Sequence, residues 1–238
     1  MMRLDRFLAN QGMGTRKEVK KIIKKGLVKV DGTIIFKDDY KFDETASVVT
    51  VDDEVIEYQK DIYILMNKPA GFVCANEDHL HETVFDLLPF SSQNLFSVGR
   101  LDKDTTGVLL ISNDGVLAHR LLAPSRHVEK CYETDLAAPI SEEQIKLLSA
   151  PLDLGDFVTM PAKVQVLEER KILLRICEGK FHQVKRMMKA VGNEVCALKR
   201  IQFGPLTLGS LEEGEWRFLN EDEIVSLREV HKNDHRNN

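Results

Sequence analysis

The spacing of hydrophobic and polar positions predicts an amphipathic helix near the amino end of the chain. Val19, Ile22 and Ile23 share one half of a helical wheel, and basic side chains occupy the other half over residues 16–25. Thr15 followed by Glu18 is a capping box, which predicts that the helix starts at residue 16. One side of this helix should therefore pack on a core and the other should present a stripe of cations.

The segments on either side of this helix have their own patterns. Residues 3–12 read as a shorter helix, and Gly26 is placed to end the longer one. Residues 27–35 read as two short strands joined by the turn-forming pair Asp31 and Gly32. Two helices and a hairpin are thus expected within the first sixty residues.

From residue 61 onward the pattern changes to apolar runs of strand length separated by turn residues. A polar tail follows at 231–238, and we expect it to be disordered. Helices are indicated by the cap pairs Ser141 with Gln144 and Asn220 with Glu223, and by the segment 180–192. The expected strands are 62–66, 72–75, 108–112, 132–136, 162–167, 172–177, 195–201 and 216–219. Many strands with a few interspersed helices predict an α+β domain.

Charge is distributed unevenly along the chain. The overall formal charge is −5, but residues 1–37 contain ten Lys or Arg and three acids, a net of +7. Residues 38–61 contain two Lys and nine acids, a net of −7. A lysine-rich helix is often only a solvated surface, yet these cations lack interleaved Glu partners, which favours contact with a phosphate backbone.

Composition excludes several other classes of protein. No apolar run approaches the ~20 residues that span a bilayer, and the first residues lack a secretory pattern, so we expect a soluble cytoplasmic protein. The four cysteines have neither CxxC spacing nor a histidine at metal-ligand spacing, which argues against a disulfide framework and a zinc site. We expect them to be reduced and mostly buried.

The stretch "SVGRLDKDTTGVLLISNDG", residues 97–115, places one carboxylate, Asp102, between Arg100 and Lys103. It is not a P-loop, because no Gly-Lys-Ser/Thr follows, and the chain has no GxGxxG. An Asp beside basic residues is usually a surface ion pair. The segment 180–192 adds a second basic cluster, with Phe181 and Met187 expected on its apolar, core-facing stripe.

The motifs taken together give these residues a different meaning. The first sixty residues resemble the S4 RNA-binding domain. The ordered set "NKPAGFVC", "GRLDKDTTGVLLISNDG", "EKCY" and "EGKFHQVKRMMKAVG" resembles the RsuA family of RNA pseudouridine synthases over the whole chain. The resemblance implies an S4-like domain at 1–60, a catalytic domain with a mixed, mainly antiparallel sheet at 61–230, and the tail at 231–238.

The resemblance also implies roles for particular residues. Asp102 would be the catalytic carboxylate, Tyr132 would stack on the uracil and act as a proton-transfer base, and Lys185 would keep Asp102 charged, where many relatives have Arg. Thr105, Thr106 and Gly107 would form the corner that presents Asp102. The expected RNA-binding residues are Arg100, Arg16, Lys17, Lys20, Lys21, Lys24, His182, Gln183 and Arg186.

The reaction implied by the resemblance breaks the bond from N1 to C1′ of uridine and joins C5 to C1′, so no cofactor and no metal are expected. The implied partner is ribosomal RNA, with closest motif wording to the enzymes that modify position 516 of 16S rRNA, in an assembly intermediate. No membrane partner is expected, and the chain should be a monomer. Whether Asp102 attacks the sugar or the base stays open.

A different rRNA substrate and two functions of other classes are the alternatives. Sister enzymes with the same S4 module act on 23S rRNA, so the module alone does not choose the substrate. A non-catalytic S4-type ribosome-assembly protein would be favoured by loss of Asp102 or Tyr132, and both residues are present. An S4-bearing methyltransferase would need a glycine-rich nucleotide-binding turn, which the sequence lacks.

Overall fold

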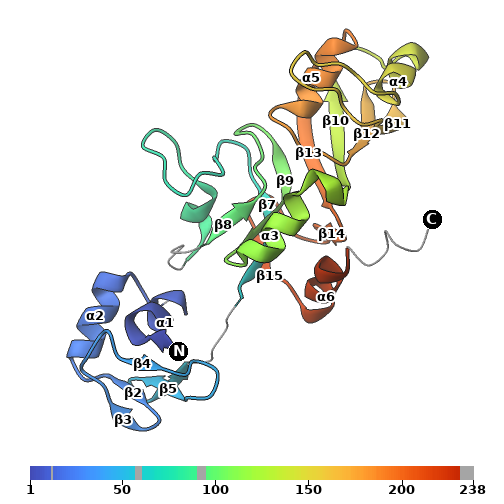
Figure 1. Cartoon of the computed structure of the whole chain (residues 1–238). Helices are drawn as coiled ribbons and strands as arrows, with labels where there is room; N and C mark the ends of the chain where they lie inside the picture. Colours follow the sequence, from blue (N-terminus) through green and yellow to red (C-terminus); the bar gives the residue numbers. More distant parts are fainter. Residues whose placement is uncertain (12, 57–60, 90–94, 231–238) are drawn as a thin grey trace. The chain divides into compact units, whose positions relative to one another are not determined.

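The computed structural model describes residues 1–11, 13–56, 61–89 and 95–230 of the chain. Contacts between residues divide it into two compact units (Figure 1). The smaller unit comprises Met1–Ile62 with Phe85–Phe96, and the larger comprises Tyr63–Val84 with the residues from Ser97 onward. The predicted tail at 231–238 lies outside the described residues.

The smaller unit contains the two predicted helices and the predicted hairpin. Thr15 caps α2 as expected, since its side chain accepts a hydrogen bond from the Glu18 amide while Glu18 accepts one from the Thr15 amide. Asp31 and Gly32 both have positive φ, as a two-residue hairpin turn between β2 and β3 requires. The elements are β1 (Met2–Arg3), α1 (Leu4–Asn10), α2 (Arg16–Lys24), β2 (Val28–Val30), β3 (Thr33–Ile34), β4 (Lys41–Phe42), β5 (Val49–Val51) and β6 (Glu54–Ile56).

A small hydrophobic core holds the smaller unit together. Leu4, Phe7 and Leu8 of α1 and Val19 and Ile23 of α2 are buried with the inward residues of the sheet ordered β3-β2-β5-β6. The positions that the helical pattern assigned to the core are thus buried at Val19 and Ile23, while the opposite side of α2 stays exposed. The helices therefore leave their cationic side facing solvent.

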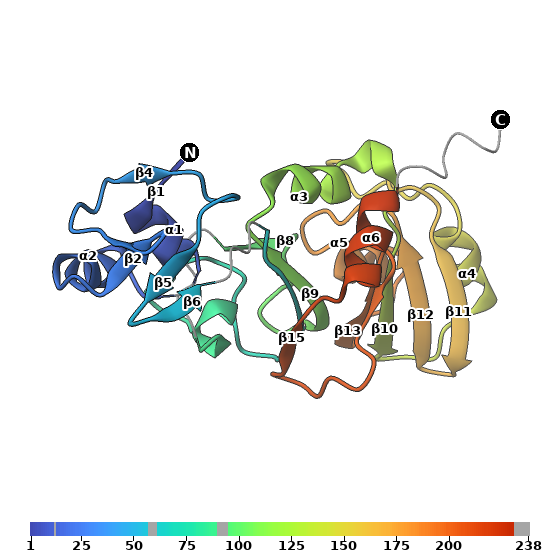
Figure 2. The same cartoon turned by 90° about the horizontal axis from the view of Figure 1, so that it is seen from below.

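The larger unit is built on a mixed, mainly antiparallel sheet (Figures 1 and 2). Its strands lie in the order β11-β12-β10-β13-β9-β7-β15, with β8 paired to β9 and β14 paired to β13. This confirms the predicted α+β class. The strands are β7 (Tyr63–Lys68), β8 (Phe96–Val98), β9 (Thr106–Ser112), β10 (Lys130–Leu136), β11 (Lys163–Glu168), β12 (Lys171–Ile176), β13 (Val195–Phe203), β14 (Leu206–Thr207) and β15 (Trp216–Phe218).

Strand β13 joins two halves of this sheet. It pairs antiparallel with β10 on one side and parallel with β9 on the other, where Lys199 lies opposite Thr106 and Arg200 opposite Gly107. The approach to Gly107 is close, because a Cβ atom there would lie 2.1 Å from the carbonyl oxygen of Arg200. Only glycine fits at this junction, and Gly107 is the last residue of the predicted corner at 105–107.

Most of the predicted strands are present, but β8 and β14 were not predicted, and one predicted strand is missing. Residues 72–75 form no strand; Val73 makes only an isolated bridge to Thr83. A helix that the sequence reading missed, α3 (Gly115–Leu122), is capped by the Asp114 side chain, which accepts hydrogen bonds from the amides of Val116 and Leu117. The predicted helices at the cap pairs form as α4 (Glu142–Leu148) and α6 (Glu221–Glu229), each with its capping box.

The helix expected over 180–192 is shorter than predicted, and this changes the position of Phe181. Helix α5 runs from Gln183 to Ala190, and His182 before it has a left-handed backbone with φ 49°. Phe181 therefore lies outside the helical wheel and is 76% exposed, so its prediction as a core residue is wrong. Val184, Met187 and Met188 are buried as expected.

Two further expectations concern membranes and cysteines. Among the described residues, no helix has both the length and the apolar composition needed to span a bilayer. The cysteines are free, with Cys74 and Cys131 buried, Cys177 half-buried and Cys196 exposed. The expectation of mostly buried thiols is therefore wrong for Cys196.

Candidate active site

A cleft of about 700 Å³ lies in the larger unit, and the segments singled out by the sequence line it. The loop 99–103 before β9 forms one side, and the segment 178–185 at the start of α5 forms another. Tyr132 of β10 and Arg200 of β13 also line the cleft. Residues distant in the sequence thus meet in one concave site.

Asp102 lies in this cleft among basic side chains. Its carboxylate is 24% exposed, with Oδ2 3.0 Å from Nζ of Lys185 and Oδ1 3.4 Å from Nε2 of His182. Lys185 also contacts Asp104, with 2.6 Å between Nζ and Oδ1. The predicted neighbour Lys185 is therefore beside Asp102, but two carboxylates share its ammonium.

The contact between Lys185 and Asp104 shifts the pKa values of both groups. Burial lowers the pKa of Lys185, but the hydrogen bonds to Asp104 and Asp102 outweigh this and leave the pKa above its usual value. The hydrogen bond from Lys185 in turn lowers the pKa of Asp104. Lys185 thus remains a cation over the physiological range, and a fixed positive charge stands next to Asp102.

A buried lysine that the sequence reading missed holds the loop of Asp102. Lys68, at the end of β7, has no exposed surface, and its ammonium donates to the carbonyl oxygens of Pro69, Lys103 and Thr105 at 2.9, 3.3 and 2.9 Å. The Thr105 amide also donates to the Asp102 carbonyl at 3.1 Å. Burial lowers the pKa of Lys68. These contacts fix the backbone that directly follows Asp102.

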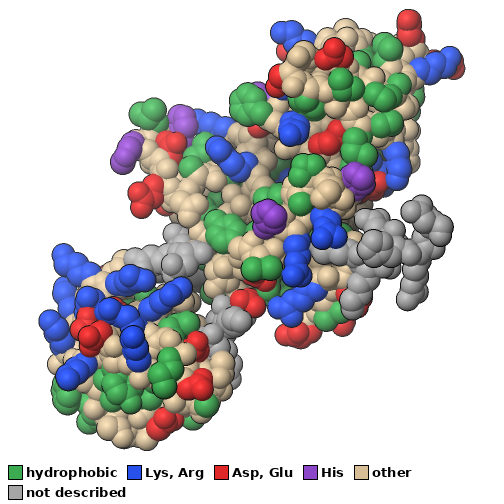
Figure 3. Space-filling view, viewed as in Figure 1, with side chains coloured by type: hydrophobic (Ala, Val, Ile, Leu, Met, Phe, Trp, Pro, Cys, Tyr) green, Lys and Arg blue, Asp and Glu red, His purple; other side chains and the backbone are tan. Residues whose placement is uncertain are grey.

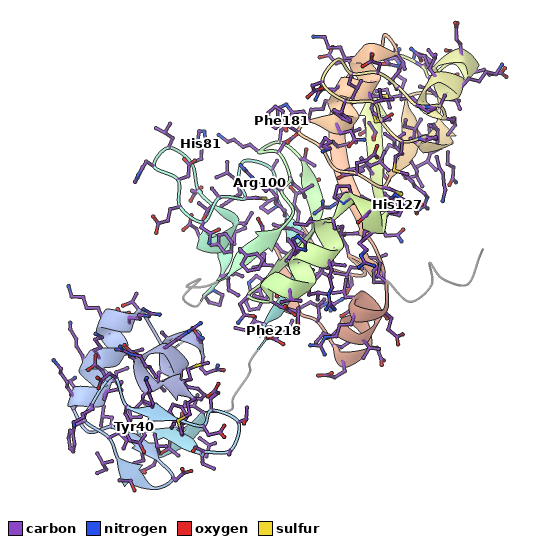
Figure 4. The ribbon with its side chains drawn as sticks, viewed as in Figure 1. Tyr40, His81, Arg100, His127, Phe181 and Phe218 are labelled. Carbon is purple, nitrogen blue, oxygen red and sulfur yellow. The ribbon has the colours of Figure 1, made fainter. Side chains whose placement is uncertain are left out.

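Tyr132 and Arg100 both line the cleft but differ in how far they are buried. Tyr132 on β10 is 7% exposed and lies opposite Arg200 of β13 in the sheet. Arg100 is exposed where it lines the cleft (Figure 4). The buried aromatic ring is suited to contact a nucleobase. The exposed guanidinium is suited to contact the phosphate backbone.

Two further buried cations line the cleft and were also missed. The ammonium of Lys130 donates to the carbonyl oxygens of Val128 and Cys177 at 2.7 and 2.8 Å. Burial, together with the charge of Arg200, lowers the pKa of Lys130 to about 8. Arg200 donates from Nε to the Val108 carbonyl at 2.8 Å, and its buried Nη2 has no hydrogen-bond partner among the described residues.

The residues after Phe181 differ in their access to the cleft. His182 faces Asp102, whereas Gln183 is buried and its Oε1 accepts hydrogen bonds from the amides of Gly179 and Lys180, both at 3.0 Å. Gln183 therefore holds the loop in shape, and its contact with RNA stays a prediction. Arg186 is also occupied within the chain, by Asp156 and by the Leu154 carbonyl.

Three of the predicted basic residues of the smaller unit line a second concave surface. A hollow of about 540 Å³ is lined by Arg3, Asp5, Arg6, Arg16, Lys17 and Lys20. Lys and Arg side chains gather over this part of the unit (Figure 3). Lys20 is paired with Asp38 at 2.8 Å, and Lys21 and Lys24 are exposed on α2 without lining the hollow.

Comparison with known proteins identifies both parts of the chain. Residues 62–190 match the family of RNA pseudouridylate synthases, and residues 2–45 match the S4 domain. The chain is 46% identical to an uncharacterised RNA pseudouridine synthase of Bacillus subtilis, a match covering 96% of this chain and 99% of that protein. It is 41% identical to the ribosomal small subunit pseudouridine synthase A of Vibrio cholerae, covering 95% and 99% of the two chains.

A solved structure supports the same relationship. A crystal structure described as a pseudouridylate synthase superposes with a TM-score of 0.68 at 36% identity, covering 95% of this chain and all of that one. The matched family segment contains Asp102, Tyr132 and Lys185. The chain therefore belongs to the RNA pseudouridine synthases and carries an S4 domain at its amino end.

Proposed function

We propose that this enzyme converts one uridine of 16S rRNA, the one at position 516, to pseudouridine, with Asp102 as its catalytic carboxylate. The observation that carries the proposal is the ion pair of Asp102 and Lys185 in the cleft, in a chain that matches a ribosomal small subunit pseudouridine synthase over nearly its whole length. The isomerisation changes bond connectivity without adding or removing atoms. It requires a charged carboxylate at the sugar or base carbon and a group that manages a proton.

The surroundings of Asp102 support this role. A carboxylate reacts with or stabilises an electron-poor carbon only while it is ionised, and the positively charged ammonium of Lys185 lies 3.0 Å from the Asp102 carboxylate. Lys68 and Gly107 keep the loop in one conformation, so that little reorganisation is needed when substrate binds. Asp102 is the residue we propose to act on the flipped nucleotide.

Tyr132 and the basic residues have separate roles in the proposal. Tyr132, nearly buried in the cleft, stacks on the extruded uracil and takes part in proton transfer. Arg100 contacts the RNA near the vacated base position. Arg16, Lys17 and Lys20 around the hollow of the smaller unit contact phosphates outside the target nucleotide.

The substrate is chosen by the shape of the surrounding RNA, since uracil itself is common. We therefore expect activity on 16S rRNA, or on an assembly intermediate that carries ribosomal proteins, and little on a short single-stranded oligonucleotide. The enzyme acts in the cytoplasm as a monomer in this proposal.

The test incubates the purified full chain with 16S rRNA, with a small-subunit assembly intermediate and with 23S rRNA, and maps pseudouridine by mass spectrometry. Product at position 516 in a 16S-containing substrate supports the proposal, and product confined to 23S rRNA rejects the substrate while keeping the reaction. Asp102→Asn should abolish product, whereas Asp222→Asn, an exposed change on α6, should retain it. Turnover by folded Asp102→Asn protein would remove Asp102 from its role.

A further inference from the structure

Phe181 is an exposed aromatic ring at the cleft, in a position that its sequence pattern did not predict. It lines the cleft, yet 76% of its surface is accessible to solvent (Figure 4). Single exposed apolar residues are common and need no explanation by themselves. Phe181 differs because its ring stacks on His182, with centroids 3.8 Å apart and planes 18° from parallel.

The contacts of His182 place this stacked pair next to the reacting carboxylate. Nε2 of His182 lies 3.4 Å from Oδ1 of Asp102. Only the side chain of His182 thus lies between the Phe181 ring stacked on it and the Asp102 carboxylate. A nucleotide held against Phe181 would be adjacent to the nucleotide that Asp102 acts on.

The loop that carries Phe181 is held on both sides. The side-chain Oε1 of Gln183 accepts hydrogen bonds from the backbone amides of Gly179 and Lys180, and the backbone amide of Gln183 donates to the Lys180 carbonyl at 3.1 Å. The left-handed backbone of His182 then turns the chain into α5. Phe181 is presented by a fixed turn, so ordering its backbone adds little to the entropic cost of binding.

We propose that Phe181 is a stacking platform for a base next to the target uridine; this inference rests on the proposed function. Extruding a nucleotide removes stacking from its neighbours, and an aromatic ring at the cleft replaces part of it. The exposed ring does not fit the role of holding the extruded uracil itself, since that base enters the cleft where Tyr132 is buried. Stacking is tolerant of base identity, so Phe181 contributes affinity and position but little sequence preference.

The proposal predicts a loss of affinity without a loss of chemistry. Base stacking on an aromatic side chain contributes ~1–3 kcal/mol, which corresponds to roughly 5- to 150-fold in affinity at 1.4 kcal/mol per tenfold. Phe181→Ala should weaken RNA binding within that range and keep the single-turnover rate at saturating RNA. Because the ring is uncharged, the salt dependence of binding should keep its slope.

Variants at the same position separate stacking from general apolar contact. Phe181→Trp keeps a π face and should bind like the wild type, whereas Phe181→Leu keeps apolar bulk without a π face and should bind like Phe181→Ala. Phe218→Ala is the matched control, because Phe218 on β15 is 47% exposed but is not among the described residues that line the cleft. Its affinity should equal that of the wild type.

The experiment measures equilibrium binding to 16S rRNA in the Asp102→Asn background, and single-turnover pseudouridine formation in the wild-type background. Affinity of Phe181→Ala within twofold of the wild type, or full affinity of Phe181→Leu, would overturn the proposal. A slower reaction at unchanged affinity would instead assign Phe181 to positioning His182. Absence of product from the wild-type chain on every RNA would reject the proposed function, a result distinct from any of these.

Discussion

Lys130 makes the stability of the larger unit depend on pH in a direction that can be calculated. Its ammonium is nearly buried beside Arg200 and donates to two carbonyl oxygens, and its pKa is lowered from 10.5 to about 8. Between these values the unfolded chain binds a proton that the folded chain has released. The free energy of unfolding should therefore rise with pH in this window.

The magnitude follows from the size of the shift. A difference of about 2.5 pKa units at 1.36 kcal/mol per unit gives roughly 3 kcal/mol over the whole window. Between about pH 7.5 and about pH 9.5, the linkage relation gives a gain of about 2 kcal/mol. The pKa values of Cys74, Cys131 and Cys177 are raised by burial, and their contribution falls as pH rises, so wild-type data alone would understate the effect.

The assay is urea-induced unfolding of the wild type and of Lys130→Met at several pH values across this range. Methionine keeps the length of the side chain and cannot titrate, and the thiols are the same in both proteins. The difference in unfolding free energy between wild type and variant should increase in favour of the wild type by about 2 kcal/mol from the lower to the higher pH. Parallel pH profiles for the two proteins would refute the reasoning.

Three other substitutions test separate parts of the structure. Changing Lys17, Lys21 and Lys24 to Ala should weaken RNA binding and make the slope of log affinity against log salt concentration shallower by roughly 2–3. As a control, changing Lys146, Lys163 and Lys189 together to Ala should leave this slope nearly unaltered. Gly107→Ala should lower the unfolding free energy by roughly 3 kcal/mol or more, measured in urea, because its Cβ would overlap the Arg200 carbonyl at a φ of 105°. Lys68→Met should lower the single-turnover rate, since the Lys103 and Thr105 carbonyls lose their donor; an unchanged rate would show that the loop of Asp102 needs no such support.

Local rules were sufficient for much of the fold. The capping pairs at Thr15, Ser141 and Asn220 start helices where the sequence indicated, because a cap depends on only four consecutive residues. The predicted apolar runs other than 72–75 also became strands of the large sheet, since they too were read from short local patterns. Helix α3 was missed although Asp114 is a good cap, since its apolar residues directly follow a strand and give no clear change of period.

The site was only partly predictable. Motif resemblance led to Asp102, Tyr132 and Lys185, and all three line the cleft. Lys68 and Arg200 could not be found from pattern, because a charged residue inside an apolar run looks like an interruption until the carbonyl groups around it are known. Phe181 was misassigned because the helical wheel treated residues 180–192 as one helix. The left-handed backbone of His182 prevents this, so the helix starts only at Gln183 and Phe181 precedes it.

The position of β13 between β10 and β9 has a consequence for when an active site can exist. The loop of Asp102 leads into β9, whereas Tyr132 is on β10, on the other side of β13, and Lys185 is on α5. Within the described sheet, β13 is the strand that bridges these halves, and it is formed by residues 195–203. A nascent chain that has emerged only as far as α5 contains every proposed catalytic residue but lacks the strand that brings them together. Because pairing of distant strands is slow, the smaller unit, whose α-helices and four-stranded sheet all lie within residues 1–56, can be folded and able to meet RNA before catalysis is possible.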